Sequence, residues 1–260
     1  MIKAKKSLGQ NFLKSKRIID KIVKTADLKP KDTVLEVGPG KGILTEKLLE
    51  KSKKVIAIEK DCRLIEFLQE KFKQEIENNH LTLIYNDILE IDPRTLIKAP
   101  YKIVANIPYY ITGQFLRKFL SSNFQPTKIV VMLQKEVAKR ITTSDKKESI
   151  LSLSVKTYGK PKYITTVKAI NFSPVPKVDS AILSIDEISK NLLKDTDEKA
   201  FFQLVKKGFS SKRKMLVNNL SFIDKNELKE TFDKFNIPIK VRAEDLSLQN
   251  WINLTNYLKK

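Results

Sequence analysis

The sequence has very few of the residues on which metal sites and disulfides depend. Among its 260 residues are one cysteine, Cys62, and one histidine, His80. A single cysteine excludes a disulfide within the chain and is typical of a reducing compartment, so we expect a cytoplasmic protein. Zinc sites need several Cys, His or carboxylate ligands, and a Ser-His-acid triad needs a histidine at the catalytic centre. We therefore expect no metal and no hydrolytic triad, and we expect His80 to be a solvated loop residue.

Long apolar runs are missing as well. No stretch is long enough to cross a bilayer, and the basic N-terminal stretch lacks the apolar core of a signal peptide. We therefore expect no membrane association. An apolar content of 41% is still enough for one large domain, or for a large and a small one, and we expect a monomer.

Acidic residues are scarce relative to basic ones, 30 against 50, which gives a net charge of +20. This charge predicts a polyanionic partner, most simply nucleic acid, although solvated basic faces would give the same composition. Residues 1–31 alone carry ten Lys or Arg and two Asp, a charge of +8. We expect Lys5 and Lys6 of this arm to contact RNA. Lys212, Arg213 and Lys214 are suited to phosphate contacts, or simply to a solvated helix end.

Only seven glycines occur. Three of them, Gly38, Gly40 and Gly42, stand at alternate positions directly after an apolar run. The sequence T-V-L-E-V-G-P-G-K-G-I-L of residues 33–44 predicts a strand, a glycine turn and a helix. An ordinary tight turn is the simpler alternative. The spacing is not the dinucleotide pattern G-x-G-x-x-G, because the third glycine stands one place early. Glu59, about 20 residues further on, is placed to accept both hydroxyls of a ribose. The pattern suits a nucleoside cofactor without pyrophosphate, with S-adenosylmethionine as the obvious candidate.

Apolar runs and helical stripes alternate along the first two thirds of the chain. They predict a doubly wound, Rossmann-like α/β fold with a mostly parallel sheet, completed by an antiparallel hairpin. Together with the S-adenosylmethionine pattern of residues 33–44, this is the fold expected of a class I methyltransferase. Ligands of such sheets lie at the carboxyl ends of the strands, where Gly38, Glu59, Asp87 and Asn106 fall. The expected strands span 33–37, 54–59, 81–84, 102–105 and 128–133, the hairpin spans 162–168 and 178–185, and helices span 43–51, 62–77, 134–141 and 146–157.

Composition also predicts the domain organisation. Residues 1–31 form a basic arm and a helix, and residues 32–189 form the cofactor-binding domain. A polar stretch near residue 190 separates them from residues 190–260, which lack any strand pattern and predict a small helical domain whose basic charge suits nucleic acid.

Asn106-Ile107-Pro108-Tyr109 directly follows a predicted strand. The side-chain oxygen of Asn106 and the carbonyl of Pro108 can each accept one N–H of an exocyclic amine on a nucleobase. This would localise the lone pair of an otherwise poor nucleophile. Tyr109 and Phe172 could stack on the two faces of the base. The simpler alternatives are a strand-ending turn and, for the two aromatic residues, ordinary core packing.

With these motifs in place, the chain resembles the ribosomal RNA adenine N6,N6-dimethyltransferases, of the bacterial KsgA type, almost from end to end. The resemblance rests on the following segments: 8–13 (L-G-Q-N-F-L), 36–40 (E-V-G-P-G), 59–61 (E-K-D), 106–109 (N-I-P-Y), 172–180 (F-S-P-V-P-K-V-D-S), 209–214 (F-S-S-K-R-K) and 243–247 (A-E-D-L-S). The segments beyond residue 190 lie outside the core that methyltransferases share, so they carry the most weight.

The resemblance implies dimethylation of two adjacent adenines in the 3′-terminal hairpin of 16S rRNA in immature 30S subunits, with S-adenosylmethionine as donor and S-adenosylhomocysteine as product. It also implies a role for each matching residue. Asn11 and Leu13 would line the cofactor site, Gly38 and Gly40 would lie near the methionine part, Glu59 would hold the ribose, Asp87 the adenine amine, and Asn106 both cofactor and target. The chain departs from the family at Ile107 and Ser173, often Leu and Tyr; neither position has a proposed polar role.

Three other functions stay open at this point. An enzyme that methylates an adenine of 23S rRNA, of the macrolide-resistance type, would share the core motifs, and only the arm and the tail favour the small-subunit enzyme. A non-enzymatic nucleic-acid binder of the same fold would be expected to have lost Asn106 or Gly38, yet both are present. A small-molecule methyltransferase would not need the basic arm.

Overall fold

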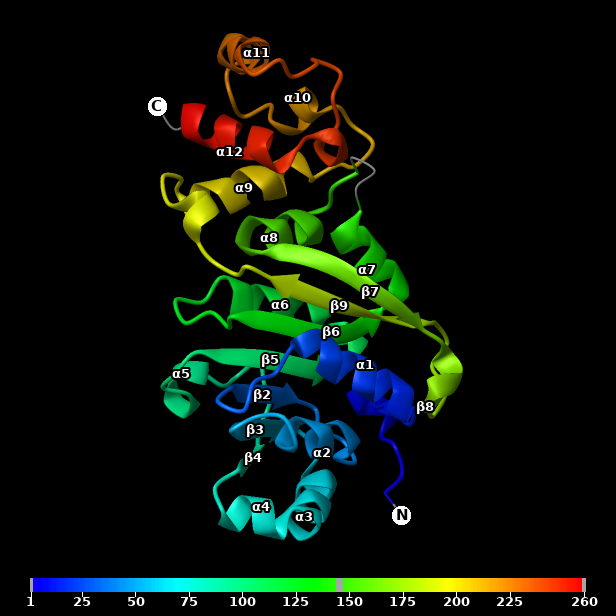
Figure 1. The fold of residues 1–260 in the computed structure, drawn as a ribbon. Helices are drawn as coiled ribbons and strands as arrows, with labels where there is room; N and C mark the ends of the chain where they lie inside the picture. Colours follow the sequence, from blue (N-terminus) through cyan, green and yellow to red (C-terminus); the bar gives the residue numbers. More distant parts are fainter. Residues whose placement is uncertain (1, 144–146, 259–260) are drawn as a thin grey trace. The chain divides into compact units, whose positions relative to one another are not determined.

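The computed structural model describes residues 2–143 and 147–258, apart from the side chain of Lys6. Figure 1 labels its strands and helices. The strands are β1 (Phe12–Leu13), β2 (Thr33–Val37), β3 (Lys54–Glu59), β4 (Leu81–Tyr85), β5 (Tyr101–Asn106), β6 (Lys128–Gln134), β7 (Lys160–Val167), β8 (Phe172–Ser173) and β9 (Ser180–Asp186). The α-helices are α1 (Lys16–Ala26), α2 (Ile43–Leu49), α3 (Cys62–Lys71), α4 (Lys73–Glu77), α5 (Pro93–Leu96), α6 (Thr112–Leu120), α7 (Lys135–Thr142), α8 (Ile150–Tyr158), α9 (Glu198–Gly208), α10 (Leu216–Asn219), α11 (Lys225–Lys234) and α12 (Leu248–Tyr257).

The chain divides into two compact units that do not follow simple sequence halves. One contains residues 1–138 and 160–188, and the other contains residues 139–159 and 189–260. The chain passes between the units three times, and the third passage, at 188–189, lies close to the polar stretch noted in the sequence. Nothing in the sequence indicated that residues 139–159 belong to the second unit. A compact unit is not the same as a domain, so the predicted domain boundaries stay predictions.

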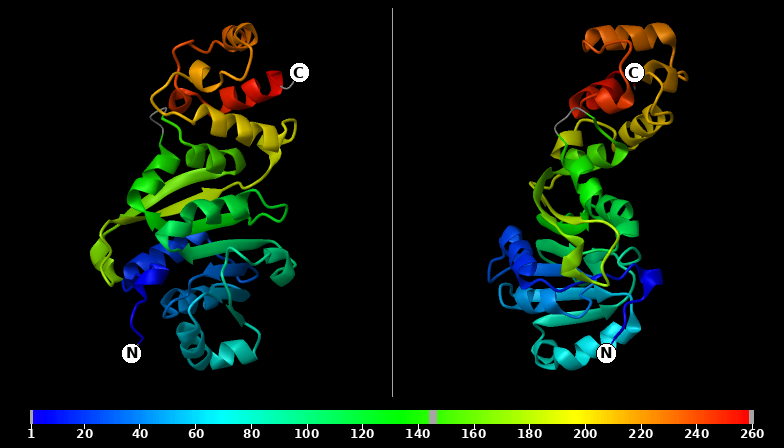
Figure 2. Two further views of the ribbon diagram at one scale, coloured as in Figure 1. Left: turned by 180° about the vertical axis from the view of Figure 1, so that it is seen from behind. Right: turned by 90° about the vertical axis from the view of Figure 1, so that its right-hand side faces the viewer.

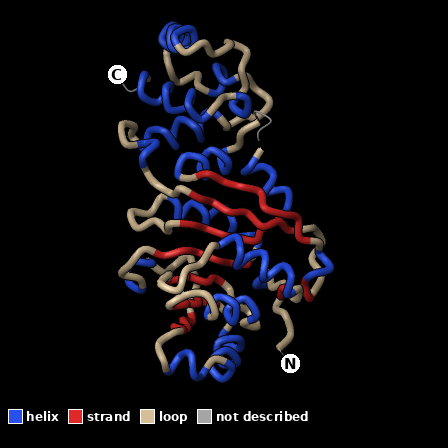
Figure 3. Tube along the Cα trace, viewed as in Figure 1, coloured by secondary structure: helices blue, strands red, loops and turns tan. Residues whose placement is uncertain are grey.

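The first unit is built on a seven-stranded sheet with the order β4-β3-β2-β5-β6-β9-β7. Strands β4, β3, β2, β5 and β6 are parallel, whereas β9 pairs antiparallel with both β6 and β7. The red strands of Figure 3 show the sheet in one view. The predicted fold class is therefore confirmed, including the hairpin.

Helices cover both faces of this sheet because its strands are apolar on both sides. Val34, Val55 and Val104 face a core shared with α1, α2 and α3. Figure 2 shows α6 on the face opposite α1. One predicted helix differs: residues 62–77 form α3 and α4, which break at Phe72 (φ −113°, ψ 30°). Its ring is 3% exposed and belongs to the core, so packing overrides helical continuity there.

The N-terminal arm is held against the first unit by a short second sheet. Strand β1 pairs antiparallel with β8, with Phe12 opposite Ser173 and Leu13 opposite Phe172. Ile19 and Ile22 of α1 are buried in the core. The arm is therefore ordered structure on the surface of this unit and reaches the strand ends where the pocket lies.

The second unit contains helices and loops throughout its described residues. Its core gathers side chains from α8 to α12 around Trp251, the only tryptophan. Helix α9 ends at Gly208, and a Cβ built there would lie 2.3 Å from Cη2 of Trp251. The glycine is thus required by close packing between α9 and α12. None of the described helices has the length and apolarity of a membrane span.

Candidate functional site

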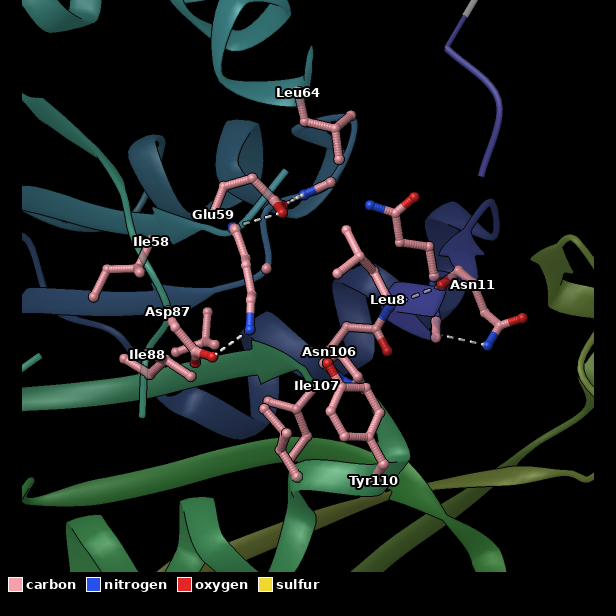
Figure 4. Close-up of a pocket in the computed structure, with 18 of the residues that line it drawn as sticks. Leu8, Asn11, Ile58, Glu59, Leu64, Asp87, Ile88, Asn106, Ile107 and Tyr110 are labelled. Atoms are coloured by element: carbon pink, nitrogen blue, oxygen red, sulfur yellow. Dashed lines mark hydrogen bonds and ion pairs between the residues drawn. The ribbon is translucent and has the colours of Figure 1, made fainter. Parts of the chain in front are cut away.

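Four neighbouring strands of the first unit place a functional side chain or turn at the same edge of the sheet. Gly38 follows β2, Glu59 ends β3, Asp87 follows β4 and Asn106 ends β5, and all four line one pocket. Figure 4 shows Glu59, Asp87 and Asn106 around a common space, with Leu8 and Asn11 of the arm beside it. The sequence argument from parallel strand ends therefore brings the expected residues together.

The glycine turn between β2 and α2 is left-handed at all three glycines, with φ of 67°, 59° and 76° at Gly38, Gly40 and Gly42. At Gly38 a Cβ would meet only the carbonyl oxygen of Asn106 at 3.6 Å, so the backbone angle and not space selects glycine. Glycine is required at position 42 for a different reason, because a Cβ built there would lie 2.5 Å from Cε2 of Phe72. The third glycine thus serves packing of α2 on α3, and the pocket uses only Gly38 and Gly40.

Glu59 is nearly buried and accepts three main-chain N–H groups. Its Oε2 accepts from Gly40 at 3.2 Å, and its Oε1 accepts from Lys60 and Asp61 at 2.9 Å each. Burial raises the pKa of Glu59 above its usual range, while the three N–H groups act in the opposite direction. The carboxylate is thereby fixed toward the pocket, and its remaining lone pairs suit a pair of ribose hydroxyls.

Glu36, inside β2, is 1% exposed, and neither of its carboxyl oxygens has a hydrogen-bond partner among the described residues. Burial raises its pKa to about 8, while the nearby hydroxyl of Thr45 acts against this effect and the charge of Glu59 adds to it. At neutral pH Glu36 is therefore mostly protonated. It does not line the pocket.

Asp87 is engaged in an ion pair at the pocket's edge. Its Oδ2 lies 2.6 Å from Nζ of Lys60, and its Oδ1 accepts from the N–H of Leu89 at 2.9 Å. Burial alone would raise the pKa of Asp87, but these hydrogen bonds more than offset it and the pKa lies below its usual range. Asp87 is a charged acceptor that suits an adenine amine once Lys60 shares or leaves it.

The N-terminal arm closes one side of the pocket. The side-chain amide of Gln10 donates to Asp61 at 2.8 Å, and Asp61 is also paired with the guanidinium of Arg63 at 2.6 Å. Arg63 holds the pKa of Asp61 at about 2, so this anchor stays charged. The cavity volume is about 90 Å³, below the ~300–1,000 Å³ typical of ligand sites. The acceptors at its walls, Glu59 and Asp87, fit the hydroxyls and the amine of a nucleoside.

Asn106 and Pro108 are oriented by the main chain around them. Nδ2 of Asn106 donates to the carbonyl of Asn11 at 3.3 Å, and no described residue donates to its Oδ1. The carbonyl of Pro108 accepts one N–H, from Ile111 at 3.2 Å, which leaves its second lone pair. Two acceptor oxygens, two residues apart in the chain, are therefore available where β5 ends.

The aromatic residues only partly follow the prediction. Tyr109 lines the pocket, is half-buried and is fixed by a 2.7 Å hydrogen bond between its hydroxyl and that of Ser180. Phe172 is 1% exposed and belongs to the core behind β8, so in this conformation it offers no face to a base. Tyr110, which the sequence analysis missed, lines the pocket and is 62% exposed. The pair Tyr109-Tyr110, shortly after a predicted strand, is the sequence feature that could have indicated it.

The remaining predicted residues lie outside this pocket. Leu13 borders a smaller neighbouring cavity, which shares Gly38 and Asn106 with the pocket. Lys5 is exposed on the arm, and the side chain of Lys6 falls outside the described part. Three exposed basic residues, Lys212, Arg213 and Lys214, follow α9 in the second unit.

The turn that precedes these basic residues is held by Asn219, whose Nδ2 donates to the carbonyls of Gly208 and Ser211. His80 differs from the prediction, because it is half-buried and its Nε2 lies 2.9 Å from the carbonyl of Ser52. Among the described residues no three His, Cys, Asp or Glu side chains are grouped as a metal site.

A glycine turn, a ribose-type carboxylate and an Asn-x-Pro-Tyr turn at adjacent strand ends define a Rossmann-like methyltransferase of the class that uses S-adenosylmethionine. Within this class, the chain belongs to the ribosomal RNA adenine dimethylase family, whose model matches residues 1–260.

Curated relatives and solved structures agree with this assignment. The chain is 43% identical over 258 residues to "Ribosomal RNA small subunit methyltransferase A" of Dehalococcoides mccartyi strain BAV1, covering 97% of the chain and 88% of the relative. It is 40% identical to the protein of the same name from Fusobacterium nucleatum, covering 97% and 96%. A dimethyladenosine transferase from Plasmodium falciparum superposes with a TM-score of 0.79 at 28% identity, covering 94% and 95%. The 23S rRNA methyltransferase ErmE superposes with a TM-score of 0.77 at 26% identity, covering 96% and 100%.

Proposed function

We propose that this protein transfers methyl groups from S-adenosylmethionine to N6 of two adjacent adenines in the 3′-terminal hairpin of 16S rRNA within the immature small subunit. The observation that carries the proposal is the arrangement at Asn106. Its Nδ2 donates to the carbonyl of Asn11, so its Oδ1 remains as an acceptor, and the carbonyl of Pro108, two residues further on, keeps a second lone pair. Two fixed acceptors are what an aromatic amine needs to become a nucleophile.

Cofactor binding rests on the residues of the glycine turn and the neighbouring strand ends. Glu59 would hold the ribose hydroxyls, Asp87 the adenine amine, and Gly38 and Gly40 the methionine part, with Asn11 and Leu13 on the arm side. When bound, S-adenosylmethionine supplies an electrophilic methyl group on a positively charged sulfur. Glu59, held by three N–H groups, needs no rearrangement to accept hydroxyl donors, which favours binding.

The amine is activated by geometry and not by a strong base. An exocyclic amine is flat because its lone pair is delocalised into the ring. Accepting one N–H at Oδ1 of Asn106 and the other at the carbonyl of Pro108 favours a pyramidal nitrogen and localises its lone pair. The proton leaves as positive charge develops on nitrogen. Such preorganised acceptors are worth about 10²–10³ in rate.

The target base has to be held flat while this occurs. Tyr109 is fixed through Ser180 and would stack on one face of an extruded adenine, a contact worth about 1–3 kcal/mol. Phe172 would reach the second face only if β8 moved, because its ring is buried. RNA contacts from Lys5, Lys6, Lys212, Arg213 and Lys214 would supply the electrostatic part of binding. The cytoplasmic location and monomeric state expected from the sequence fit this role.

Similarity to ErmE favours one alternative, methylation of an adenine of 23S rRNA. The higher identity to small-subunit enzymes, 40–43% against 26%, supports the 16S substrate. The test is to incubate the protein with labelled S-adenosylmethionine and either immature 30S or 50S particles, and to map the modified bases. Label in adjacent dimethyladenines of 16S rRNA is the expected result. Label confined to 23S rRNA would overturn the proposal, and no label on either particle would favour a non-enzymatic binder.

A further inference from the structure

The second unit contains a groove that the proposed chemistry does not use. It lies along α9 and α12 and has a cavity volume of about 840 Å³. Its walls come from Leu204 of α9, Ile223 of the turn before α11, and Thr255 and Leu258 at the end of α12. Figure 1 shows α9 and α12 next to each other in this unit. The volume is in the range of sites for small organic groups.

An aromatic ring lies open at this groove. Phe222 is 61% exposed and lines the groove, and Nζ of Lys207 lies 5.6 Å from its ring centroid. A phenylalanine so exposed gains little from burial in the chain itself. The ammonium of Lys207 lies over the ring, and an exposed ring that has a cation nearby is suited to stacking of an unpaired nucleobase.

Charge at the groove has one sign. Lys206 and Lys207 both line it, and none of the residues that line it is acidic. Within the described residues neither lysine is paired with a carboxylate. Gln203 and Ser210 add hydrogen-bond donors and acceptors to the same walls, suited to the edge of a base.

We propose that this groove binds an unpaired nucleotide of RNA, with the base stacked on Phe222 and the flanking phosphates at Lys206 and Lys207. The inference rests on the proposed function only in taking RNA as the partner, and it extends the contacts beyond the basic run at 212–214. An acidic peptide would use the lysines but would not need an open ring, and a second copy of this chain would bring its own positive charge. A single-stranded nucleic acid satisfies both features.

The test uses the full chain carrying Phe222→Trp, which keeps an aromatic ring and adds a fluorophore. Trp251 is fully buried, so the unsubstituted protein supplies the background signal. We expect saturable quenching by an unstructured RNA strand of about ten nucleotides and little quenching by the same sequence in a blunt duplex. Phe222→Leu is expected to weaken binding of the single strand at least about fivefold. Ile239→Ala, a change at another exposed apolar residue of this unit, is the matched control and is expected to leave binding unchanged.

Several results would overturn the proposal. Equal binding of inorganic polyphosphate and RNA with no effect of Phe222→Leu would mean charge attraction only. A concentration-dependent change in the fluorescence of the Phe222→Trp variant without RNA would mean self-association, and quenching by an acidic peptide but not by RNA would mean a protein partner. Methyl transfer is assayed separately on 30S particles. Transfer without quenching refutes the groove alone, and quenching without transfer refutes the enzymatic proposal alone.

Discussion

The side-chain amide of Asn106 donates a hydrogen bond to the main-chain carbonyl of Asn11, 3.3 Å away and 95 positions earlier in the chain. This bond ties the end of β5 to the N-terminal arm and decides which end of the amide remains free. Because the N–H end is used, the oxygen is left for a donor. Asn106 therefore has two parts to play: its N–H end holds the arm that borders the pocket, and its oxygen is the proposed acceptor for the target amine.

Asn106→Ala removes both the acceptor and the contact with the arm. We expect kcat for methyl transfer to fall at least about 10²-fold, because one of two preorganised acceptors is lost. RNA affinity should stay within about twofold, since no phosphate contact is removed. Single-turnover transfer and a filter-binding assay measure the two quantities. Activity equal to that of the parent protein would rule out the acceptor role.

Lys60→Met tests the ion pair at the pocket. Lys60 is 53% exposed and Asp87 18%, so solvent screens the pair and its contribution to stability is small. Removing the ammonium frees Asp87 for an adenine amine, and we expect S-adenosylmethionine to bind up to about fivefold more tightly by calorimetry. Lys47→Met, which removes the ion pair with Glu50 on α2, is the control. Weaker binding in Lys60→Met would mean that the lysine itself holds the cofactor.

Glu36 predicts a pH dependence of stability. Its pKa is raised from an unfolded value near 4.5 to about 8 by burial, so the folded state holds a proton that the unfolded state releases. Stability of the apoprotein should therefore fall as pH rises from about 5 to 8, by about 3 kcal/mol at pH 7 from this group. Glu36→Gln should flatten the curve and raise stability at pH 7. Urea unfolding across this pH range measures it, and an unchanged slope would show that Glu36 is not the source.

The fold and the location of the site were predictable because both follow from short-range patterns. Apolar runs alternating with helical stripes define a parallel sheet. The sheet brings Gly38, Glu59, Asp87 and Asn106 to one edge through its backbone alone, independently of side-chain packing. The hairpin of β7 and β9 followed from the same logic.

The features that sequence did not predict all depend on tertiary packing. Phe172 is buried because β8 pairs with the arm, a contact between segments about 160 residues apart. Gly42 is required by the ring of Phe72, and Asp87 is paired with Lys60 across the pocket. Residues of these types also occur at surfaces and sites, so their identity alone does not reveal which role they have.

Salt dependence tests the basic run of the second unit. If Lys212, Arg213 and Lys214 contact phosphates, RNA binding should weaken steeply with salt. Replacing all three with Ala should then reduce the slope of log K against log salt by roughly 2–3. The control variant replaces Lys225, Lys229 and Lys240 with Ala, which removes the same number of charges. Its slope of log K against log salt should stay close to that of the parent protein. An unchanged slope in the first variant would show that the run is merely solvated.

The last prediction concerns stability and uses two helical glycines, Gly208 of the second unit and Gly113 of the first, which have opposite surroundings. A Cβ at Gly208 would lie 2.3 Å from Cη2 of Trp251 and 3.0 Å from Cδ1 of Leu216, whereas a Cβ at Gly113 in α6 would meet nothing within 4 Å. Gly208→Ala should therefore destabilise the protein by about 1–3 kcal/mol, because neither a buried indole nor the helix can move freely. Gly113→Ala should be neutral or stabilising by up to about 1 kcal/mol, since alanine favours the helix. Thermal unfolding followed by Trp251 fluorescence and by circular dichroism measures both, and equal effects of the two substitutions would contradict the close contact between α9 and α12.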